Sequence, residues 1–406
     1  MQGAGRALVW QAKAFMGFLR KMRYLIRAWL CYLYRGFGVG YQSRKGLVLL
    51  MSRIASRRAF LLAAPAIVTG AAHAQSPVAG MDRLRQQWWH FRSRFMAPDG
   101  RVIDTGNRNI SHSEGQGWGM LMALAADDRA SFERIWAWTR HSLSRPRDAL
   151  HAWRFRPNAA NPVEDMNNAT DGDLFLAWAL LEAGRIWAAS HHTESGQAIA
   201  RDILRLLVRP AGGMALLLPG ARGFERRDHI VVNPSYYCFP ALRVLATALP
   251  DPAWLRVAGD GLSLLRAARF GRWGLPPDWL SVNKQDRRLT LPSNWAPRFS
   301  YDAVRVPLYL GWVGLGQEPA LQSAADFWTD SIHRQMPAWT DLSSNAVSPY
   351  TASPGIAAVA GFAAQLARRA LPATDTRAAD PMPDYYSGAL TALVSLARRD
   401  SGADFW

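Results

Sequence analysis

Two carboxylates stand at the start of an apolar segment, ATDGDLFLAWALLEAGRIW, which runs from Ala169 to Trp187. Asp171 and Asp173 come just before apolar residues that recur at helical spacing, so we expect them in the first turn of a buried helix. If that turn opens onto a cleft, these carboxylates can do chemistry. The alternative is that either Asp is an ordinary N-terminal cap. Two further acidic motifs of the same style favour the chemical interpretation.

Glu114 lies in the second motif, SHSEGQGWGM, at the start of another apolar helix. Three glycines in five positions allow a second backbone or a ligand to come close. Apolar surface beside a carboxyl group raises its pKa, and Trp118 supplies such surface, so Glu114 suits a general acid. The alternative is a capping glutamate on a helix that packs tightly through its glycines.

Asp302 lies in the third motif, RFSYDAVRVP, three residues before Arg305. This spacing lets the two side chains pair on one face of a helix, which lowers the pKa of the Asp and keeps it ionised for work as a general base. The alternative is a surface ion pair without function. Glycoside hydrolysis needs one protonated carboxyl and one ionised carboxylate, and Glu114 and Asp302 fit these two roles.

Aromatic residues on several segments are candidates for stacking on sugar rings. Such rings are flat and costly to expose without purpose, although each can equally belong to the core. The candidates are Trp118, Trp153, Tyr236, Tyr237, Tyr301 and Tyr385.

Helical periodicity dominates the chain, which predicts an all-α fold. We expect a toroid of helical hairpins, whose long loops at 97–114, 144–170, 209–235 and 269–301 carry the binding groups. Strand-like alternation is limited to 212–218 and 229–232. Helices are predicted near 81–96, 115–126, 130–143, 172–190, 195–208, 236–248, 253–268, 302–314, 319–334, 354–369 and 386–398.

The first part of the chain explains most of its net charge of +17. Residues 1–58 carry 12 Lys and Arg and no acid, and the remaining residues are nearly balanced at 36 basic against 31 acidic. This balance does not support nucleic-acid binding by the main body. Residues 51–74 read as a twin-arginine signal peptide, with cleavage after Ala74.

Residues 1–50 precede that signal, although signal peptides need a free N-terminus. We therefore expect that translation begins at Met51 and that 1–50 is a mis-assigned extension. The alternative is a basic, aromatic membrane-surface helix around 7–34. The expected organisation is thus 1–50 as the extension, 51–74 as the signal and 75–406 as one catalytic domain in the periplasm or outside the cell.

Only Cys31 and Cys238 occur, so loss of Cys31 with the leader excludes an internal disulfide. No Cys/His cluster has the spacing of metal ligands, and we interpret His191 and His192 as an isolated surface pair. We expect no cofactor and no metal.

The three motifs SHSEGQGWGM, ATDGDLFLAWALLEAGRIW and SYDAVRVP together resemble glycoside hydrolase family 8. The resemblance covers about 80–400 with the motifs in family order, and it extends to the periplasmic endoglucanases encoded with bacterial cellulose synthase. One departure is Leu176, where the family has Ile or Met; this conservative difference casts little doubt on the match.

The resemblance implies an (α/α)6 barrel, an inverting mechanism and a β-1,4-glucan substrate such as cellulose. Glu114 matches the proton donor, Asp302 the base, and Asp171 the carboxylate that positions the sugar at the cleavage site. Tyr301 and Arg305 match residues that position the base and its water. Trp153 and Tyr236 match a stacking Trp and a site Tyr, and we add Trp118 and Tyr385 as substrate-binding candidates.

The sequence leaves two alternatives open. The same family hosts enzymes that act on xylan, chitosan and mixed-linkage glucan, and the aromatic groove could also serve a glycan-binding scaffold without catalysis. The partners we expect are a β-1,4-glucan chain and the cellulose synthase secretion complex, with no nucleic acid and with the chain as a monomer.

Overall fold

The protein is described by a computed structural model that covers residues 77–371 and 382–401. The predicted signal peptide and the extension before it lie outside the described residues. Ala74–Trp406 make up one compact unit. Within the described ranges, no helix has both the length and the apolar composition that a membrane crossing requires.

Helices dominate this unit, and each predicted helix is found. They are α2 Pro77–Phe95, α3 Ser113–Ala125, α4 Arg129–Leu143, α5 Thr170–Ile186, α6 Ser190–Leu207, α7 Phe239–Ala248, α8 Pro252–Ala267, α9 Arg305–Trp312, α10 Pro319–Thr329, α11 Pro354–Ala367 and α12 Tyr385–Ser401, with a 3-10 turn η1 at Pro234–Tyr236.

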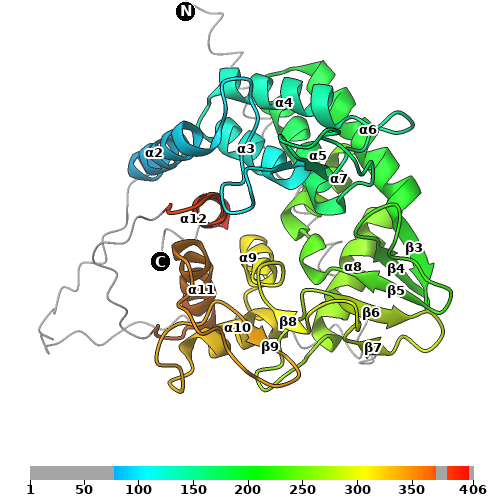
Figure 1. The fold of residues 1–406 in the computed structure, drawn as a ribbon, viewed down its shortest axis with the longest axis vertical. Helices are drawn as coiled ribbons and strands as arrows, with labels where there is room; N and C mark the ends of the chain where they lie inside the picture. Colours follow the sequence, from blue (N-terminus) through cyan, green and yellow to red (C-terminus); the bar gives the residue numbers. More distant parts are fainter. Residues whose placement is uncertain (1–76, 372–381, 402–406) are drawn as a thin grey trace, which may run out of the picture. The chain divides into compact units, whose positions relative to one another are not determined.

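Contacts between the helices divide them into an inner and an outer ring, the arrangement of the (α/α)6 barrel that the sequence predicts; Figure 1 shows the helices themselves. In the inner ring α3 packs against α5, α5 against α7, α7 against α9, and α9 against α12, which returns to α3. Each inner helix is backed by an outer one: α4 lies on α3, α6 on α5, α8 on α7, α10 on α9 and α2 on α12. The remaining helix, α11, contacts α9, α10 and α12.

The inner and outer helices differ in how much of their surface is buried. All eight residues of α9 are buried, as are fourteen of the seventeen in α5, because inner helices meet neighbours on every side. The outer helix α6 buries one face, through residues such as Gly196, Ile199 and Ile203. The periodic apolar stripe that predicts a helix from sequence is therefore strongest in the outer ring.

Short antiparallel strands lie in the loops between helices. Figure 1 shows β3 to β7 together at one side of the ring, with β8 and β9 beside α10. The predicted strands at 212–218 and 229–232 correspond to β4 and β5. The strands are β1 Ser111–His112 with β2 Arg154–Phe155, β3 Val208–Ala211 with β4 Met214–Leu217, β5 His229–Val232 with β6 Leu280–Asn283 and β7 Leu289–Thr290, and β8 Arg298–Phe299 with β9 Thr340–Asp341.

Several helix ends differ from the prediction, such as α10, which ends at Thr329 and not at 334, and two of the differences have identifiable reasons. The predicted helix at 172–190 stops at Ile186, and Ala188 with φ +53° separates it from α6. The predicted helix at 302–314 begins only at Arg305. The backbone N–H groups of Ser300 and Ala303 bond instead to the carboxylate of Asp278, which holds this segment as a separate turn.

Candidate active site

One guanidinium group joins the three acidic motifs. Arg305, in the first turn of α9, contacts Glu114 and Asp171 through Nη1, the latter at 3.4 Å from Oδ2. Its Nη2 lies 2.5 Å from Oδ1 of Asp302 and donates to the Ser235 hydroxyl at 3.1 Å. Carboxylates from three distant segments therefore converge on a single cation.

The start of α3 positions Glu114. The ring of His112 caps this helix by accepting a hydrogen bond from the Gly115 amide at 3.1 Å, and the β1–β2 pair fixes the preceding residues. A Cβ at Gly172 would overlap the Ser113 hydroxyl and the backbone nitrogen of Glu114. Glycine at this position therefore lets the first turns of α3 and α5 approach closely enough for Asp171 and Glu114 to share Arg305.

Solvent reaches two of the three carboxylates. The side chains of Asp302 and Glu114 keep 30% and 17% of their exposure, whereas Asp171 keeps 4% and Arg305 only 3%. Glu114 and Asp302 are thus accessible to a substrate and to water. Asp171 and Arg305 form the buried charged floor beneath them.

Burial raises the pKa of Asp171 to about 7. The Gly172 amide, His112 and Tyr236 oppose this shift, while the negative charge of Asp173 adds to it. Positive charge that develops on a distorted sugar beside this carboxyl group would favour its ionised form.

The predicted pairing of Asp302 with Arg305 is present, but the predicted direction of its pKa is wrong. Part of the Asp302 side chain reaches solvent, but the protein packed around its carboxyl group, followed by the carboxylates of Asp278 and Asp171, raises its pKa well above the usual range. A base with a raised pKa binds a proton more strongly, and it functions only at a pH where it remains ionised.

Asp173 serves a different purpose from Asp171. Its carboxylate accepts hydrogen bonds from the His151 amide at 2.9 Å and from the Asn168 side chain at 3.0 Å, and it lies 3.1 Å from Nδ1 of His151. It is fully buried. Asp173 therefore anchors the loop between α4 and α5 and does not face the other acidic motifs.

The structure corrects the substrate-binding assignments of Trp118 and Tyr385. Both are buried, and they stack on each other at 6.2 Å with an angle of 19°. The Trp118 ring lies 5.8 Å from the Arg305 guanidinium, and a Cβ at Gly115 would lie 2.5 Å from the Tyr385 hydroxyl. These two rings pack in the interior on the side of Arg305, and they present no face to a ligand.

Three other predicted aromatic residues have accessible positions. Tyr236 is half-buried and hydrogen-bonds Asp171. Trp153 is half-buried, with Arg154 over its ring at 4.3 Å, and its backbone carbonyl accepts from Ser113 next to Glu114. Tyr301 is 47% exposed beside Asp302. Tyr237, in contrast, is a core residue.

Sequence reasoning missed an aromatic row that begins at Tyr236. Trp279 meets Tyr236 at 6.4 Å and stands between Phe224 at 5.7 Å and Trp295 at 5.2 Å, both stacked nearly parallel to it. All four rings are half-buried. Trp295 also lines a surface hollow of about 390 Å³. The only signal in the sequence was the presence of these rings in long loops.

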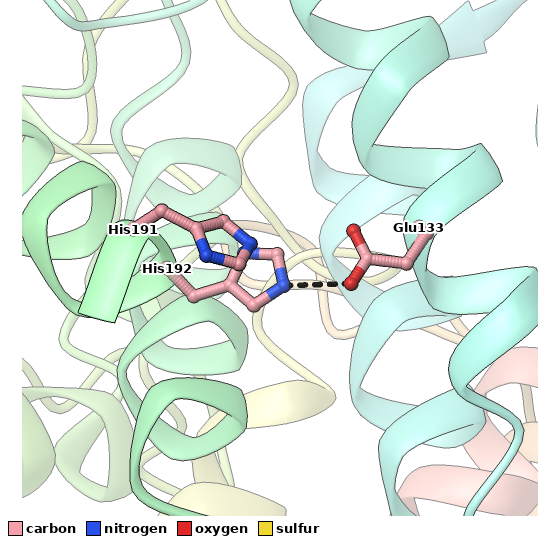
Figure 2. Close-up of side chains that lie close together, drawn as sticks. All are labelled: Glu133, His191 and His192. Atoms are coloured by element: carbon pink, nitrogen blue, oxygen red, sulfur yellow. Dashed lines mark hydrogen bonds and ion pairs between the residues drawn. The ribbon is translucent and has the colours of Figure 1, made fainter. Parts of the chain in front are cut away.

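His191 and His192 are not the isolated surface pair that the sequence suggests. His192 is buried, and its Nε2 lies 2.9 Å from Glu133 of α4 (Figure 2). Within the described residues these three side chains are the group with ligand atoms close enough for a metal ion. A metal-bound histidine normally donates its other ring N–H, yet Nδ1 of His192 has no partner, and Arg129 lies 3.5 Å from Glu133. The group fits a bond between α4 and α6 better than a metal centre.

Comparison with known proteins gives the class of this protein. The pattern described as glycosyl hydrolases family 8 matches residues 60–400, and the chain belongs to that family. It is therefore a glycoside hydrolase of the inverting kind.

Relatives of the chain within this class carry the name endoglucanase. The chain is 45% identical to a protein named "Probable endoglucanase" from Novacetimonas hansenii over 79% of this chain and 92% of that protein. An endo-beta-1,4-glucanase from Acetobacter xylinum has a solved structure with a TM-score of 0.74 and 44% identity, covering 79% of this chain and 99% of that one. The endoglucanase Cel10 of Klebsiella pneumoniae gives 0.72 and 39%, covering 78% and 99%.

Proposed function

We propose that this chain is an endo-β-1,4-glucanase in which Glu114 is the general acid and Asp302 the general base. The observation that carries this assignment is the convergence of both carboxylates, each partly exposed, on the two terminal nitrogens of Arg305. Inverting hydrolysis needs an acid and a base on opposite faces of the sugar, about 6.5–9.5 Å apart, with water between the base and the anomeric carbon.

Hydrolysis then proceeds in one displacement. Glu114 gives its proton to the glycosidic oxygen as the bond from that oxygen to C1 breaks. A water molecule attacks C1 from the opposite face and gives a proton to Asp302, so the new hydroxyl has the α configuration. The two carboxyl groups exchange protonation states and recover through solvent.

Asp171, Arg305 and Tyr236 position the reacting groups in this proposal. Asp171 is too buried to act as the base, and its carboxylate can bond a hydroxyl of the sugar at the cleavage point. Arg305 fixes the separation of the acid and the base. Positive charge on Arg305 also limits the repulsion among the three carboxylates.

The half-buried ring of Trp153 and the exposed ring of Tyr301 then mark where the glucan chain lies in this proposal. Trp153 is on the Glu114 side, and Tyr301 is on the Asp302 side. Flat rings stack on the apolar faces of glucose units. A row of such rings suits a long unbranched β-1,4-glucan such as cellulose.

The cellular role in this proposal is to trim glucan during cellulose secretion. The chain would be exported by the signal at 51–74, act as a monomer in the periplasm or outside the cell, and work beside the cellulose synthase secretion complex. The export-signal pattern and the resemblance to endoglucanases encoded with cellulose synthase support this role.

Substitution of the two carboxyl groups tests the assignment. Glu114→Gln and Asp302→Asn should each lower cleavage of soluble carboxymethylcellulose by at least about 1,000-fold, because each removes one half of the proton transfer. Circular dichroism and thermal unfolding should show that both variants remain folded. Most of the activity remaining in either variant would contradict its role, and a panel of xylan, chitosan and mixed-linkage glucan would separate the family's other substrates.

A further inference from the structure

Asp278 is a buried carboxylate that the assigned roles leave unused. It lies in the loop before β6 and is 7% exposed. Its Oδ1 accepts hydrogen bonds from the backbone N–H groups of Ser300 at 3.0 Å and Ala303 at 2.7 Å. Its Oδ2 accepts from the Ser300 hydroxyl, and the backbone N–H of Asp302 is a further donor.

These donors belong to the turn that carries Asp302. This turn precedes α9, so its N–H groups have no partner within that helix. Asp278 accepts from them, from a segment more than twenty residues earlier in the chain. Burial raises the pKa of the Asp278 carboxyl group, and these N–H donors oppose that shift, because they can only donate and so favour the ionised form.

Asp278 also places negative charge beside Asp302. A nearby like charge makes a carboxylate a stronger base, since it favours the neutral protonated form. Arg305 opposes this effect with its positive charge. The titratable and charged groups around Asp302 are Asp278 from the loop before β6, Arg305 from α9, Asp171 from α5, Glu114 from α3, Tyr236 from η1 and Tyr386 from α12.

We propose that Asp278 is a positioning residue for the general base: its carboxylate caps the turn at residues 300–303 and holds Asp302 in place beside a second acidic side chain. This inference rests on the proposed role of Asp302. Asp278 is too enclosed by its own donors to touch a substrate, so it acts through Asp302 alone.

The variant Asp278→Asn removes the negative charge of this side chain but keeps an oxygen that can accept hydrogen bonds from the turn at 300–303. The Asn carbonyl oxygen can still accept from the backbone N–H groups of Ser300 and Ala303, and its NH2 group can donate to the Ser300 hydroxyl oxygen, so the turn keeps its bonds at these two residues. With cellohexaose as substrate, we expect the acid limb of kcat/KM against pH to move about one unit to lower pH. We expect kcat at the optimum to fall about tenfold, with KM within about twofold of the parent value.

A purely structural role would lower the unfolding temperature and kcat but leave the acid limb in place, and an unmoved limb overturns the proposal. Asp128→Asn is the matched control, because Asp128 caps α4 and bonds Trp88 and Arg92. Its pH profile should equal that of the parent protein. An equal shift in this control also overturns the proposal.

Two further variants complete the test. If Asp278→Asn does not fold, Ser300→Ala replaces it: loss of one bond to the carboxylate should lower kcat about fivefold without changing KM, and an unchanged kcat overturns the proposal. Asp302→Asn distinguishes the proposed role of Asp302 as the base from the proposed role of Asp278. Activity in Asp302→Asn refutes the assignment of the base, whereas an inactive Asp302→Asn with an unmoved limb in Asp278→Asn refutes only the role of Asp278.

Discussion

Asp171 and Asp173 stand two residues apart in the first turn of α5, and both are buried, yet they belong to different clusters. Asp171 joins Glu114 and Asp302 at Arg305, the Arg305 cluster. Asp173 bonds His151 and Asn168, the Asp173 cluster. The two side chains are chemically identical and differ in their partners, which come from distant parts of the chain. The fold therefore decides which of two neighbouring carboxylates can take part in catalysis.

The largest contrast between the clusters should appear in catalysis. Asp171→Asn should lower kcat on cellohexaose by about 100- to 1,000-fold, because the sugar at the cleavage point loses its charged partner. Asp173→Asn should stay within about threefold of the parent kcat per folded molecule. Equal losses in the two variants would mean that the clusters do not differ in function.

The pH dependence of stability should show the raised pKa of Asp171 next; burial raises the pKa of Asp173 too, so this measurement is made on Asp171 alone. Because the folded-state pKa of Asp171 is raised to about 7, the folded protein binds this proton more tightly than the unfolded chain does. Its contribution to the free energy of unfolding is greatest below about pH 4 and is lost as the pH rises through 7. Asn does not titrate.

Chemical denaturation from pH 4 to pH 8 measures this effect. The free energy of unfolding of Asp171→Asn should therefore rise relative to the parent protein, by an amount on the order of 4 kcal/mol across that range. A difference that stays constant with pH would show that Asp171 has an ordinary pKa.

Truncation of the structural carboxylate should have a smaller effect, in the opposite direction. Asp173→Ala leaves the buried His151 and Asn168 donors without an acceptor and should lower the free energy of unfolding at pH 7 by about 3 kcal/mol. Asp171→Ala should cost less at this pH, since it removes a carboxyl that is costly to ionise. The reverse order in urea unfolding would contradict the division between the clusters.

The smallest effect is expected at the rim of the Arg305 cluster. The Tyr301 hydroxyl makes an exposed contact with the Tyr350 hydroxyl at 3.2 Å, while its ring stays available for stacking. Tyr301→Phe should therefore change KM by less than about threefold, because an exposed hydrogen bond contributes little. A change above tenfold in steady-state kinetics would mean that the hydroxyl contacts substrate directly.

Local patterns in the sequence were sufficient for the helices and for the acidic motifs. The spacing of apolar residues located α3, α5 and α9. The family resemblance assigned a role to each of Glu114, Asp171 and Asp302. That Asp302 and Arg305 pair also followed from their spacing, since residues three apart in or near a helix share a face.

Contacts between distant segments could not be predicted in this way. No pattern in the sequence indicated that Arg305 would contact three carboxylates, or that Asp278 would lie beside Asp302 and help to raise its pKa. Trp118 was assigned to the substrate because its motif is shared with Glu114, yet helical rotation directs its ring into the core. His192 was placed at the surface because its partner Glu133 is far away in sequence.

The configuration of the first product tests most directly whether Glu114 and Asp302 act on opposite faces of the sugar. Proton NMR of reduced cellohexaose during the first minutes of hydrolysis distinguishes the two anomers before they equilibrate. If Glu114 protonates the leaving oxygen while Asp302 activates water on the opposite face, the α-anomer of a shorter sugar appears first. Initial appearance of the β-anomer would contradict the arrangement of acid, water and base around Arg305.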